Sequence, residues 1–522
     1  MLFNSLLFLL LFLPLVFLGY RMLLGTGRPA LVLGWLSLAS LCFYAAWAPA
    51  FVGLLLLHVA ANGLLARWLP HRGVFAAAIV ANLAVLGLFK YADFLVQTVN
   101  QLSAAGLPSP QLVLPVGISF FTFTQIAFLA DLQRGLKADR SPLRYLLFVT
   151  WFPHLVAGPV IHHARVMPQL ERAARRPPRA LAVQAGLTLF VLGLAKKVLL
   201  ADTLAGPADA AFEAARAGTS LDIASAWSGV LAYTLQLYFD FSGYSDMACG
   251  LSLMFGVRLP LNFHSPYRAV GIIEFWRRWH MTLSRFLRDY LYIPLGGSRC
   301  SPWRHRVNLM ATMVLGGLWH GASWNFVLWG AVHGVMLVLH QAWRSLSPWR
   351  LPTALAVPLT FVLVALAWIP FRAADLDSAA RMWSGLWDPA TFTGWSTWID
   401  HQAQRISALG SSEGLIERLT RAQPVTLREL SLGAAVPMLG LGLLIVWVLP
   451  NTAQIMGPLV AERDIRQLRS GNDTNTNAGI VTSTSRRIRW RPTGTWALTA
   501  GVLLGLCLLN LNRQSPFLYF QF

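Results

Sequence analysis

A histidine inside an apolar stretch is the first feature of this 522-residue chain with the type and setting for catalysis. His320 lies in the sequence LGGLWHGASWNFVLWG at 315–330, with Gly317 before it and Gly321 directly after it. Small neighbours let another group approach the imidazole closely, and histidine exchanges a proton near neutral pH. These are the properties of a general base that activates a hydroxyl. On an uninterrupted helix His333 would lie about 220° further round, so we expect it to face elsewhere and to be structural.

A second histidine, His280, lies in the segment FWRRWHMTLSRFLRDY at 275–290, which is rich in tryptophan and arginine. A continuous helix would form an aromatic stripe opposed by arginines, with these residues on its two sides: Trp276, Trp279, His280, Leu283 and Leu287 against Arg277, Arg278, Arg285 and Arg288. Such a helix suits the membrane interface or the wall of a cavity that receives an anionic cofactor. A lone histidine on an apolar stripe is more often a core residue than a catalyst, so both interpretations of His280 stay open.

Two carboxylates, Asp240 and Asp246, occur in the otherwise apolar sequence LYFDFSGYSDMACG at 237–250. Ionisable groups at membrane depth are costly, and each is a functional candidate until a partner explains it. The hydroxyls and the glycine between the two aspartates predict an interruption of the helix, packed in protein or lining a cavity. We favour a structural role for both aspartates, paired with arginines of the segment 258–306.

The composition shows which elements must position these residues. Hydrophobic residues make up 56% of the chain and charged residues 12%, against about 25% charged in soluble domains. The chain is therefore an all-α polytopic membrane protein, and a large cytosolic enzyme or a disordered chain is excluded. The amino terminus has no basic region or cleavage site and is a retained first span. Apolar stretches follow over 2–20, 31–58, 74–99, 113–134, 145–161, 183–204, 224–256, 307–345, 353–374, 432–450 and 494–512.

The net charge of +20, from 42 basic and 22 acidic residues, raises the question of a nucleic-acid partner. Basic cytoplasmic loops that meet anionic lipids explain it better, so we expect membrane lipids and no nucleic acid as partners. Arg21 and Arg28 place the first loop in the cytoplasm, and the basic segment 162–179 is expected in the headgroup layer there. The four cysteines show no metal or disulfide spacing. Only Cys300 lies in a polar stretch.

Three long motifs resemble the membrane-bound O-acyltransferase family, and within it the branch of the alginate O-acetyltransferase membrane subunit (AlgI-like) and the D-alanyl-lipoteichoic acid transfer protein. They are FWRRWHMTLSRFLRDYLYIPLGGSR at 275–299, LGGLWHGASWNFVLWG at 315–330 and LYFDFSGYSDMACG at 237–250. Shorter matches are LPVGISFFTFTQIAFLAD at 114–131, FPHLVAGPVIH at 152–162, KKVLLADTLA at 196–205, LPNTAQIM at 449–456 and the terminal SPFLYFQF. The resemblance implies a helical bundle around a transmembrane funnel, with re-entrant or interfacial helices.

The resemblance also implies an activity. It makes His320 and His280 the catalytic histidines of an O-acetyltransferase in the bacterial inner membrane, with acetyl-CoA as a cytoplasmic donor substrate and no bound cofactor. The expected partners are a periplasmic SGNH-type acetyltransferase and an exopolysaccharide biosynthesis complex, and the polymer is alginate, cellulose or another exopolysaccharide. Arg277, Arg278 and Arg285 would bind the donor, and Trp279, Trp319 and Asn325 are candidate donors to the carbonyl oxygen.

The predicted organisation has three parts: a membrane core over 1–374, an extramembrane or interfacial insertion over 375–431, and carboxyl-terminal spans over 432–522 with a basic polar loop at 461–491. The main alternative is a transporter or flippase of an acyl carrier or lipid-linked sugar, although no internal repeat supports it. Two weaker alternatives are a thioester relay through Cys300 and a scaffold for a periplasmic enzyme.

Overall fold

The computed structural model of the chain describes residues 1–136, 141–388, 435–457, 459–460, 488–511 and 517–518. Every regular element within these ranges is helical, which confirms the all-α prediction. The α-helices are α1 Leu13–Leu24, α2 Pro29–Ala45, α3 Val52–Leu65, α4 Arg72–Ser103, α5 Ile118–Gln133, α6 Pro142–Thr150, α7 His163–Arg175, α8 Ala180–Ala195, α9 Asp202–Arg216, α10 Ile223–Met254, α11 Ile272–Arg278, α12 Met281–Leu287, α13 Pro302–His320, α14 Trp324–Leu346, α15 Thr353–Arg372, α16 Leu376–Gly385, α20 Ala435–Trp447, α21 Thr452–Met456 and α24 Gly494–Asn510. Three π-helical segments, Leu7–Phe12, Lys196–Ala201 and Arg288–Tyr292, adjoin α1, α8 and α12.

Six of the helical stretches in the described part of the chain are long and apolar enough to cross a membrane. They are Leu7–Leu24, Pro49–Trp68, Arg72–Ser103, Ala180–Arg216, Trp324–Leu346 and Thr353–Arg372. The chain is thus a polytopic membrane protein. Its amino-terminal apolar segment is the first of these stretches. Three shorter apolar helices, α2, α20 and α24, accompany them.

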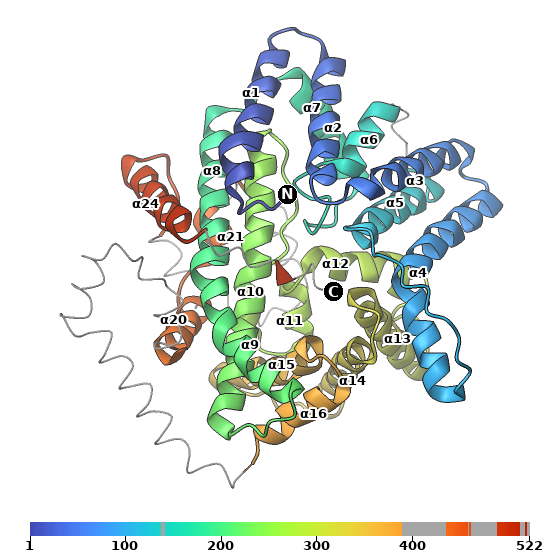
Figure 1. Ribbon diagram of the computed structural model, residues 1–522, viewed down its shortest axis with the longest axis vertical. Coiled ribbons are helices and arrows are strands. Elements are labelled where there is room, and N and C mark those ends of the chain that lie inside the picture. Colours follow the sequence, from blue (N-terminus) through green and yellow to red (C-terminus); the bar gives the residue numbers. More distant parts are fainter. Residues whose placement is uncertain (137–140, 389–434, 458, 461–487, 512–516, 519–522) are drawn as a thin grey trace.

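The centre of the molecule is the helix pair α8 and α10, which stand side by side along the long axis (Figure 1). Glycines let their backbones approach: a Cβ at Gly250 would lie 2.5 Å from the carbonyl oxygen of Gly186, and one at Gly193 2.5 Å from that of Gly243. Small residues at helix crossings are typical of membrane bundles. The predicted interruption near Asp240 is wrong, because α10 runs unbroken through this region. Its polar residues are buried against neighbouring helices without a break in the backbone hydrogen bonds.

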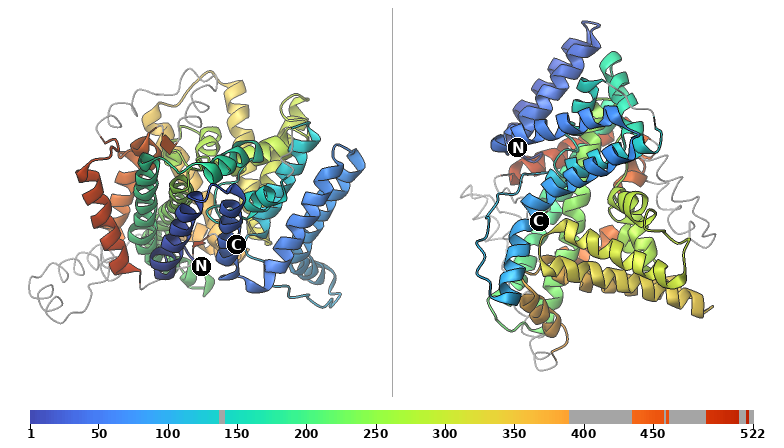
Figure 2. Two further views of the ribbon diagram at one scale, coloured as in Figure 1. Left: turned by 90° about the horizontal axis from the view of Figure 1, so that it is seen from above. Right: turned by 90° about the vertical axis from the view of Figure 1, so that its right-hand side faces the viewer.

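The remaining helices flank this pair on opposite sides. α4 lies at one edge of the molecule and α24, which packs on α8, at the other, in the view of Figure 1 and from above in Figure 2. α13 and α14 form a helical hairpin, because the chain breaks at 321–323 and turns back. The apolar stretch 307–345 is therefore two helices. Residues 389–431 of the predicted insertion and 461–487 of the predicted basic loop lie outside the described residues, so the three-part division stays a prediction.

Candidate active site

His320 is the last residue of α13, at the turn of the α13–α14 hairpin. Its side chain is buried, with 7% relative exposure, and its ring is surrounded by aromatic rings. The centroid distances are 4.9 Å to Trp319, 5.1 Å to Trp329 and 5.2 Å to Phe371. These residues come from α13, α14 and α15, so three helices converge on one imidazole.

The end of α13 is held by a lysine that the sequence analysis did not single out. Lys90, in the interior of α4, donates from Nζ to the carbonyl oxygens of Trp319 and His320, the latter at 3.1 Å. Next to it, the hydroxyl of Tyr91 donates to the carbonyl oxygen of Leu318 at 2.8 Å. A cation at a helix carboxyl terminus complements the carbonyl groups that lack an intrahelical partner. Lys90 belongs to the stretch Arg72–Ser103, which is long and apolar enough to cross a membrane, so the end of α13 is held against a candidate membrane span.

The predicted angle between His320 and His333 rested on one uninterrupted helix, and that premise is wrong. The chain reverses between α13 and α14, and the ring of Trp329 contacts both imidazoles, with centroid distances of 5.1 Å to His320 and 4.8 Å to His333. His333 is fully buried against Phe275 and Trp276 of α11 as well. It belongs to the aromatic packing behind His320.

The continuous helix predicted through His280 is also wrong. α11 ends at Arg278 and α12 begins at Met281, with His280 between them in the left-handed conformation at φ 39° and ψ 52°. This conformation costs a residue with a side chain about 1–2 kcal/mol, and such positions are concentrated at functional sites. The stripe therefore does not exist as one helical face. The break turns the ring of His280 inward, where it is 1% exposed.

Asn262, a second residue that sequence reasoning missed, fixes the orientation of His280. The Oδ1 of Asn262 accepts from the backbone N–H of Thr282 at 3.3 Å and from its hydroxyl at 2.7 Å. This atom is therefore the oxygen, and at 3.1 Å it accepts from Nδ1 of His280. The neutral ring then carries its proton on Nδ1 and leaves Nε2 with the lone pair.

The two predicted catalytic histidines meet at Trp319. Its indole lies 4.9 Å from His320 and 6.3 Å from His280, measured between ring centroids. On its other face Trp319 stacks on Phe123, which stacks in turn on Phe286. The structure thus brings His280, His320 and Trp319 into one cluster, although they come from separate elements of the chain.

The other predicted site residues lie further from this cluster or have structural contacts. Arg278 forms an ion pair with Glu274, and Arg288 pairs with Asp289 at 2.7 Å. Arg277 is exposed and Arg285 is half-buried. Trp279 is buried among Phe275, Tyr267 and Trp368. Asn325 donates from Nδ2 to the carbonyl oxygen of Ala373 at 2.7 Å, which ties the start of α14 to the end of α15.

A polar cluster lies at the far end of the aromatic column that begins at Trp319. Phe286 contacts Tyr290, whose hydroxyl donates to Oδ1 of Asp131 at 2.8 Å and lies 3.2 Å from Nδ1 of His162. His163 lies 3.6 Å from the other oxygen of Asp131. The sequence analysis did not select these residues, although Asp131 lies in an apolar stretch. In the described part of the chain, no group of histidine, cysteine, aspartate and glutamate side chains is arranged to hold a metal ion.

The carboxylates of α10 have lysine partners, not the arginines of 258–306 that the sequence analysis expected. Lys197 lies 2.8 Å from Asp240 and 2.7 Å from Asp202, and Lys196 lies 2.6 Å from Asp246. Both lysines belong to the π-helical segment Lys196–Ala201 that follows α8. α8 packs along α10 over most of its length, and the lysines that follow it therefore reach the carboxylates. The segment 258–306 also contacts α10, but it does so through residues such as Asn262 and Tyr267.

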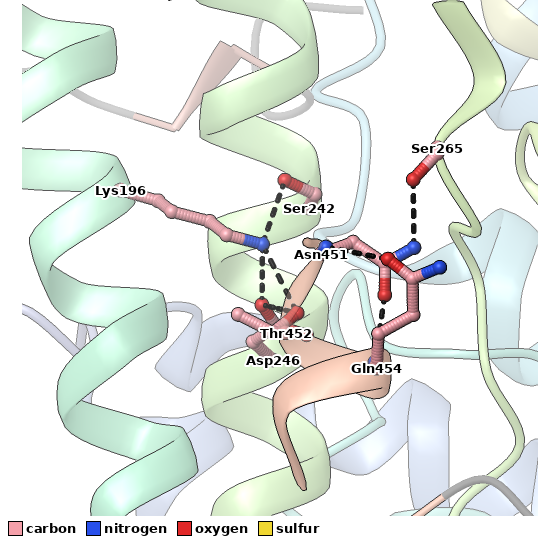
Figure 3. A network of polar contacts seen from close by, with 7 residues as sticks. All are labelled: Lys196, Ser242, Asp246, Ser265, Asn451, Thr452 and Gln454. Carbon is pink, nitrogen blue, oxygen red and sulfur yellow. Dashed lines mark hydrogen bonds and ion pairs between the residues drawn. The ribbon is translucent and has the colours of Figure 1, made fainter. Parts of the chain in front are cut away.

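The carboxyl-terminal part of the chain completes both pairs. The hydroxyl of Thr452 donates to Asp246 at 2.8 Å, and the neighbouring Asn451 donates to the hydroxyl of Ser265 at 2.7 Å (Figure 3). The backbone N–H of Leu518 donates to Asp240 at 2.9 Å. Four of the motifs noted in the sequence therefore meet at α10: those at 196–205, 237–250 and 449–456 and the carboxyl terminus.

Comparison with known proteins identifies this architecture. The sequence model of MBOAT, the membrane-bound O-acyltransferase family, matches residues 70–369, more than half of the chain. The chain belongs to the membrane-bound O-acyltransferase family. It is 37% identical over its whole length to the full "Probable alginate O-acetylase AlgI" of Azotobacter vinelandii. It is 40% identical to the "Peptidoglycan O-acetyltransferase" of Helicobacter pylori, over 74% of this chain and 80% of that protein.

A more distant relative is the "Teichoic acid D-alanyltransferase" of Bacillus subtilis, 27% identical over 57% of this chain and 77% of that protein. The predicted family resemblance is confirmed, and the chain is an O-acyltransferase. The matched region contains Lys90, Asn262, His280 and His320. Lys90 could have been selected from the sequence, because a lysine inside the apolar stretch 74–99 is costly at membrane depth. Nothing in the local sequence marks Asn262.

Proposed function

We propose that this chain transfers acetyl groups from acetyl-CoA at the cytoplasmic face of the bacterial inner membrane toward an exported polysaccharide. His320 is the general base in this proposal. The observation that supports it is the position of His320: the residue ends α13 beside the candidate membrane span α4, its imidazole is buried, and it lies in one aromatic cluster with His280. An enclosed site strengthens polar interactions and keeps water from the thioester.

The chemistry of the proposed step is simple acyl transfer. His320 accepts the proton of the acceptor hydroxyl, whose oxygen attacks the carbonyl carbon of the thioester. A carbon–oxygen bond forms, the carbon–sulfur bond breaks, and the proton passes to the leaving thiolate. Negative charge develops on the carbonyl oxygen, so an N–H donor is needed there. Trp319 is the best placed of the three predicted donors, because its ring contacts both imidazoles and Asn325 already donates to Ala373.

His280 acts as a positioning group in this scheme. Asn262 holds its ring with the lone pair on Nε2, so it can accept a hydrogen bond or a proton from a group in the cluster. Arg277, Arg278 and Arg285 remain the proposed ligands of the donor phosphates, because a guanidinium group matches phosphate oxygens in geometry and charge.

The relatives support the choice of polymer, whereas the partner is part of the proposal. Two relatives named for alginate match the chain over its whole length, whereas the relative named for peptidoglycan matches 74% of it, as one further alginate relative does. We therefore favour an exopolysaccharide of the alginate type over peptidoglycan. In the proposal a periplasmic SGNH-type acetyltransferase of an exopolysaccharide biosynthesis complex receives the acetyl group and completes delivery.

Inverted inner-membrane vesicles test the proposal, because they expose the cytoplasmic face to added donor. Vesicles that contain the protein should transfer label from radiolabelled acetyl-CoA to a membrane or lumenal acceptor, and vesicles from the deletion strain should not. Deletion should also remove the O-acetyl groups of the exported polymer, measured on the purified polymer. Transfer from another acyl donor but not from acetyl-CoA, or a fully acetylated polymer in the deletion strain, would contradict the proposal.

The same vesicles separate the enzyme from the transporter alternative. A transporter would move an acyl carrier or lipid-linked sugar across the membrane without consuming acetyl-CoA. Uptake of a labelled acyl carrier measures this movement directly.

The relay through Cys300 has little geometric support, because α13 separates Cys300 from His320 by about 27 Å at 1.5 Å per residue. Full activity of Cys300→Ser would remove it.

A further inference from the structure

A cationic pocket lies away from the histidine cluster, where three distant parts of the sequence meet. It has a volume of about 330 Å³ and is bounded by the start of α8, by α21 and by the segment 489–492 that precedes α24. Its lining includes Leu181, Arg258, Met456, Arg489, Trp490 and Arg491. Arg258 follows the carboxyl end of α10, so the pocket adjoins the central helix pair. In Figure 1 this region lies around α21 and α24, on the side of the molecule opposite α4.

The positive charge of this pocket favours the binding of an anion. The exposed residues Arg258, Arg489 and Arg491 bring three guanidinium groups to one pocket. Among the residues that the structure describes, no carboxylate lies within ion-pair distance of any of the three. Cations gathered in this way repel one another, and a phosphate between them would offset that repulsion. The planar guanidinium fork matches phosphate oxygens in geometry as well as in charge.

The floor of the pocket is apolar and firmly attached. Met456 is 2% exposed and Trp490 is 6% exposed. The indole of Trp490 donates to the hydroxyl of Thr188 at 3.2 Å, and its backbone N–H donates to the carbonyl oxygen of Ile455 at 2.8 Å. The arginines on either side of Trp490 are thus presented from a fixed point. A polar rim above an apolar floor suits an amphiphile better than a free ion.

The pocket lies at the level of lipid headgroups. Directly after Arg491 the chain enters α24, an apolar helix with outward-facing Leu498, Val502 and Leu509. Tryptophans at the start of such a helix are typical of the membrane interface, and both Trp490 and Trp496 occupy that position. Leu181 and Leu187 of the adjacent α8 are exposed too, so acyl chains have apolar surface on both helices.

The same side of the molecule carries the basic helix α7. Gln169 of α7 accepts from the backbone N–H of Arg258 at 2.9 Å and donates to its carbonyl oxygen at 3.3 Å. The segment around α7 is the one whose arginines predict a cytoplasmic headgroup position. The pocket therefore faces the leaflet in which anionic lipids meet basic protein surfaces.

We propose that this pocket binds the headgroup of an anionic phospholipid, with its phosphate between Arg258, Arg489 and Arg491 and its acyl chains along α8 and α24. A lipid at this position holds α21 against the rest of the bundle, because Met456 of α21 forms the floor. Through Thr452, α21 also donates to Asp246 of α10, so the bound lipid supports the buried Lys196–Asp246 pair.

Lipid binding to the purified full-length protein tests this directly. Delipidated protein in an uncharged detergent is titrated with phosphatidylglycerol, with phosphatidylcholine and with inorganic phosphate, and bound lipid is counted by native mass spectrometry while thermal unfolding is followed in parallel. We expect phosphatidylglycerol to be retained and to raise Tm, and neither phosphatidylcholine nor inorganic phosphate to do so. An equal effect of phosphatidylcholine, or of inorganic phosphate, overturns the assignment to an anionic phospholipid.

A matched pair of triple variants places the binding in the pocket. Arg258→Gln/Arg489→Gln/Arg491→Gln should weaken phosphatidylglycerol binding by about two orders of magnitude, since each basic residue near a membrane surface contributes roughly a factor of five to ten. The control Arg67→Gln/Arg306→Gln/Arg350→Gln removes the same charge from exposed arginines elsewhere and should change binding by about twofold at most. Equal binding by the two triple variants overturns the proposal. If the pocket variant does not fold, the comparison of phosphatidylglycerol with phosphatidylcholine and inorganic phosphate on the unaltered protein still tests whether an anionic phospholipid binds. Neither measurement involves acetyl transfer, so its outcome is separate from that of the proposed function.

Discussion

Two regions of the membrane bundle bury polar side chains in opposite ways. Along α10, Asp240 and Asp246 each lie within 2.8 Å of a lysine ammonium. At the end of α13, His320 lies among the rings of Trp319, Trp329 and Phe371. Both regions are almost inaccessible to solvent, and the sequence marks both by polar residues in apolar stretches.

The difference shows how burial separates structural from chemical roles. A buried carboxylate carries a charge that is costly to desolvate, and an ammonium partner at short distance is needed to offset it. A neutral imidazole carries no charge in its resting state and can be buried among aromatic rings. It keeps the capacity to accept a proton when a substrate hydroxyl arrives. The aspartates therefore hold helices together, and the histidines are the groups suited to chemistry.

The largest expected effect is on catalysis at the aromatic region. His320→Gln should lower acetyl transfer by about 10²–10⁴-fold, because a general base contributes about that much. The measurement is the initial rate of transfer from labelled acetyl-CoA in inverted vesicles, at equal abundance of the protein in the membrane. His305→Gln, on the same helix at its other end, is the control and should keep the normal rate. A rate of His320→Gln within the range of that control would remove His320 from the mechanism.

The lysine–aspartate region should respond in stability. Lys197→Met leaves Asp240 and Asp202 without their shared cation, and breaking a buried pair in this way costs about 3–5 kcal/mol. Unfolding of the purified protein, titrated with a denaturing detergent, measures the change. Asp240→Leu combined with Lys197→Met should recover part of the loss.

The control for that change is Arg216→Gln, which removes an exposed pair with Glu213 and should cost about 0–1 kcal/mol. If Lys197→Met were no more destabilising than Arg216→Gln, the Lys197–Asp240 pair would not be a structural element.

Lys90 is a buried charged residue, like the lysines of the lysine–aspartate region, but it contacts the end of α13 beside His320. Lys90→Met should reduce kcat by at least about tenfold with little change in KM, because the end of α13 loses two charged hydrogen bonds and a loss of about 1.4 kcal/mol in the positioning of His320 is enough for that factor. Lys90→Arg should restore part of kcat. A change in KM alone, or no rescue by arginine, would exclude a positioning role for Lys90.

The smallest effect is expected at the edge of the lysine–aspartate network. Thr452→Val removes the hydrogen bond that its hydroxyl donates to Asp246 and the one that it accepts from Lys196 at 3.2 Å, while the Lys196–Asp246 pair stays, so the free energy of unfolding should fall by about 1–2 kcal/mol. Thr499→Val on exposed α24 is the matched control and should have no measurable effect. A loss at Thr452 as large as that of Lys197→Met would mean that α21 carries more of the network than its bonds to Asp246 and Lys196 imply.

Much of this protein is determined by its sequence alone. The scarcity of charge and the length of the apolar stretches require a helical membrane protein, because only helices satisfy their backbone within one segment of a membrane. The motifs around His280 and His320 identify the family, because they are long runs of adjacent residues. The expectation that Asp240 and Asp246 have basic partners also follows from the sequence, since the cost of burying a charge does not depend on which helix supplies the partner.

Only the tertiary structure decides which groups meet. The partners of the aspartates are Lys196 and Lys197, because α8 and α10 pack closely through glycines, and no periodicity within one segment encodes that contact. The breaks at His280 and after His320 divide each predicted helix in two, so the predicted stripe through His280 and the predicted angle between His320 and His333 do not exist. A single left-handed residue or a three-residue turn overrides the period of a helix. The contact of Lys90 with α13 and the arginine pocket join residues more than 200 positions apart. Such contacts depend on how the whole bundle packs, and the local sequence carries no record of them.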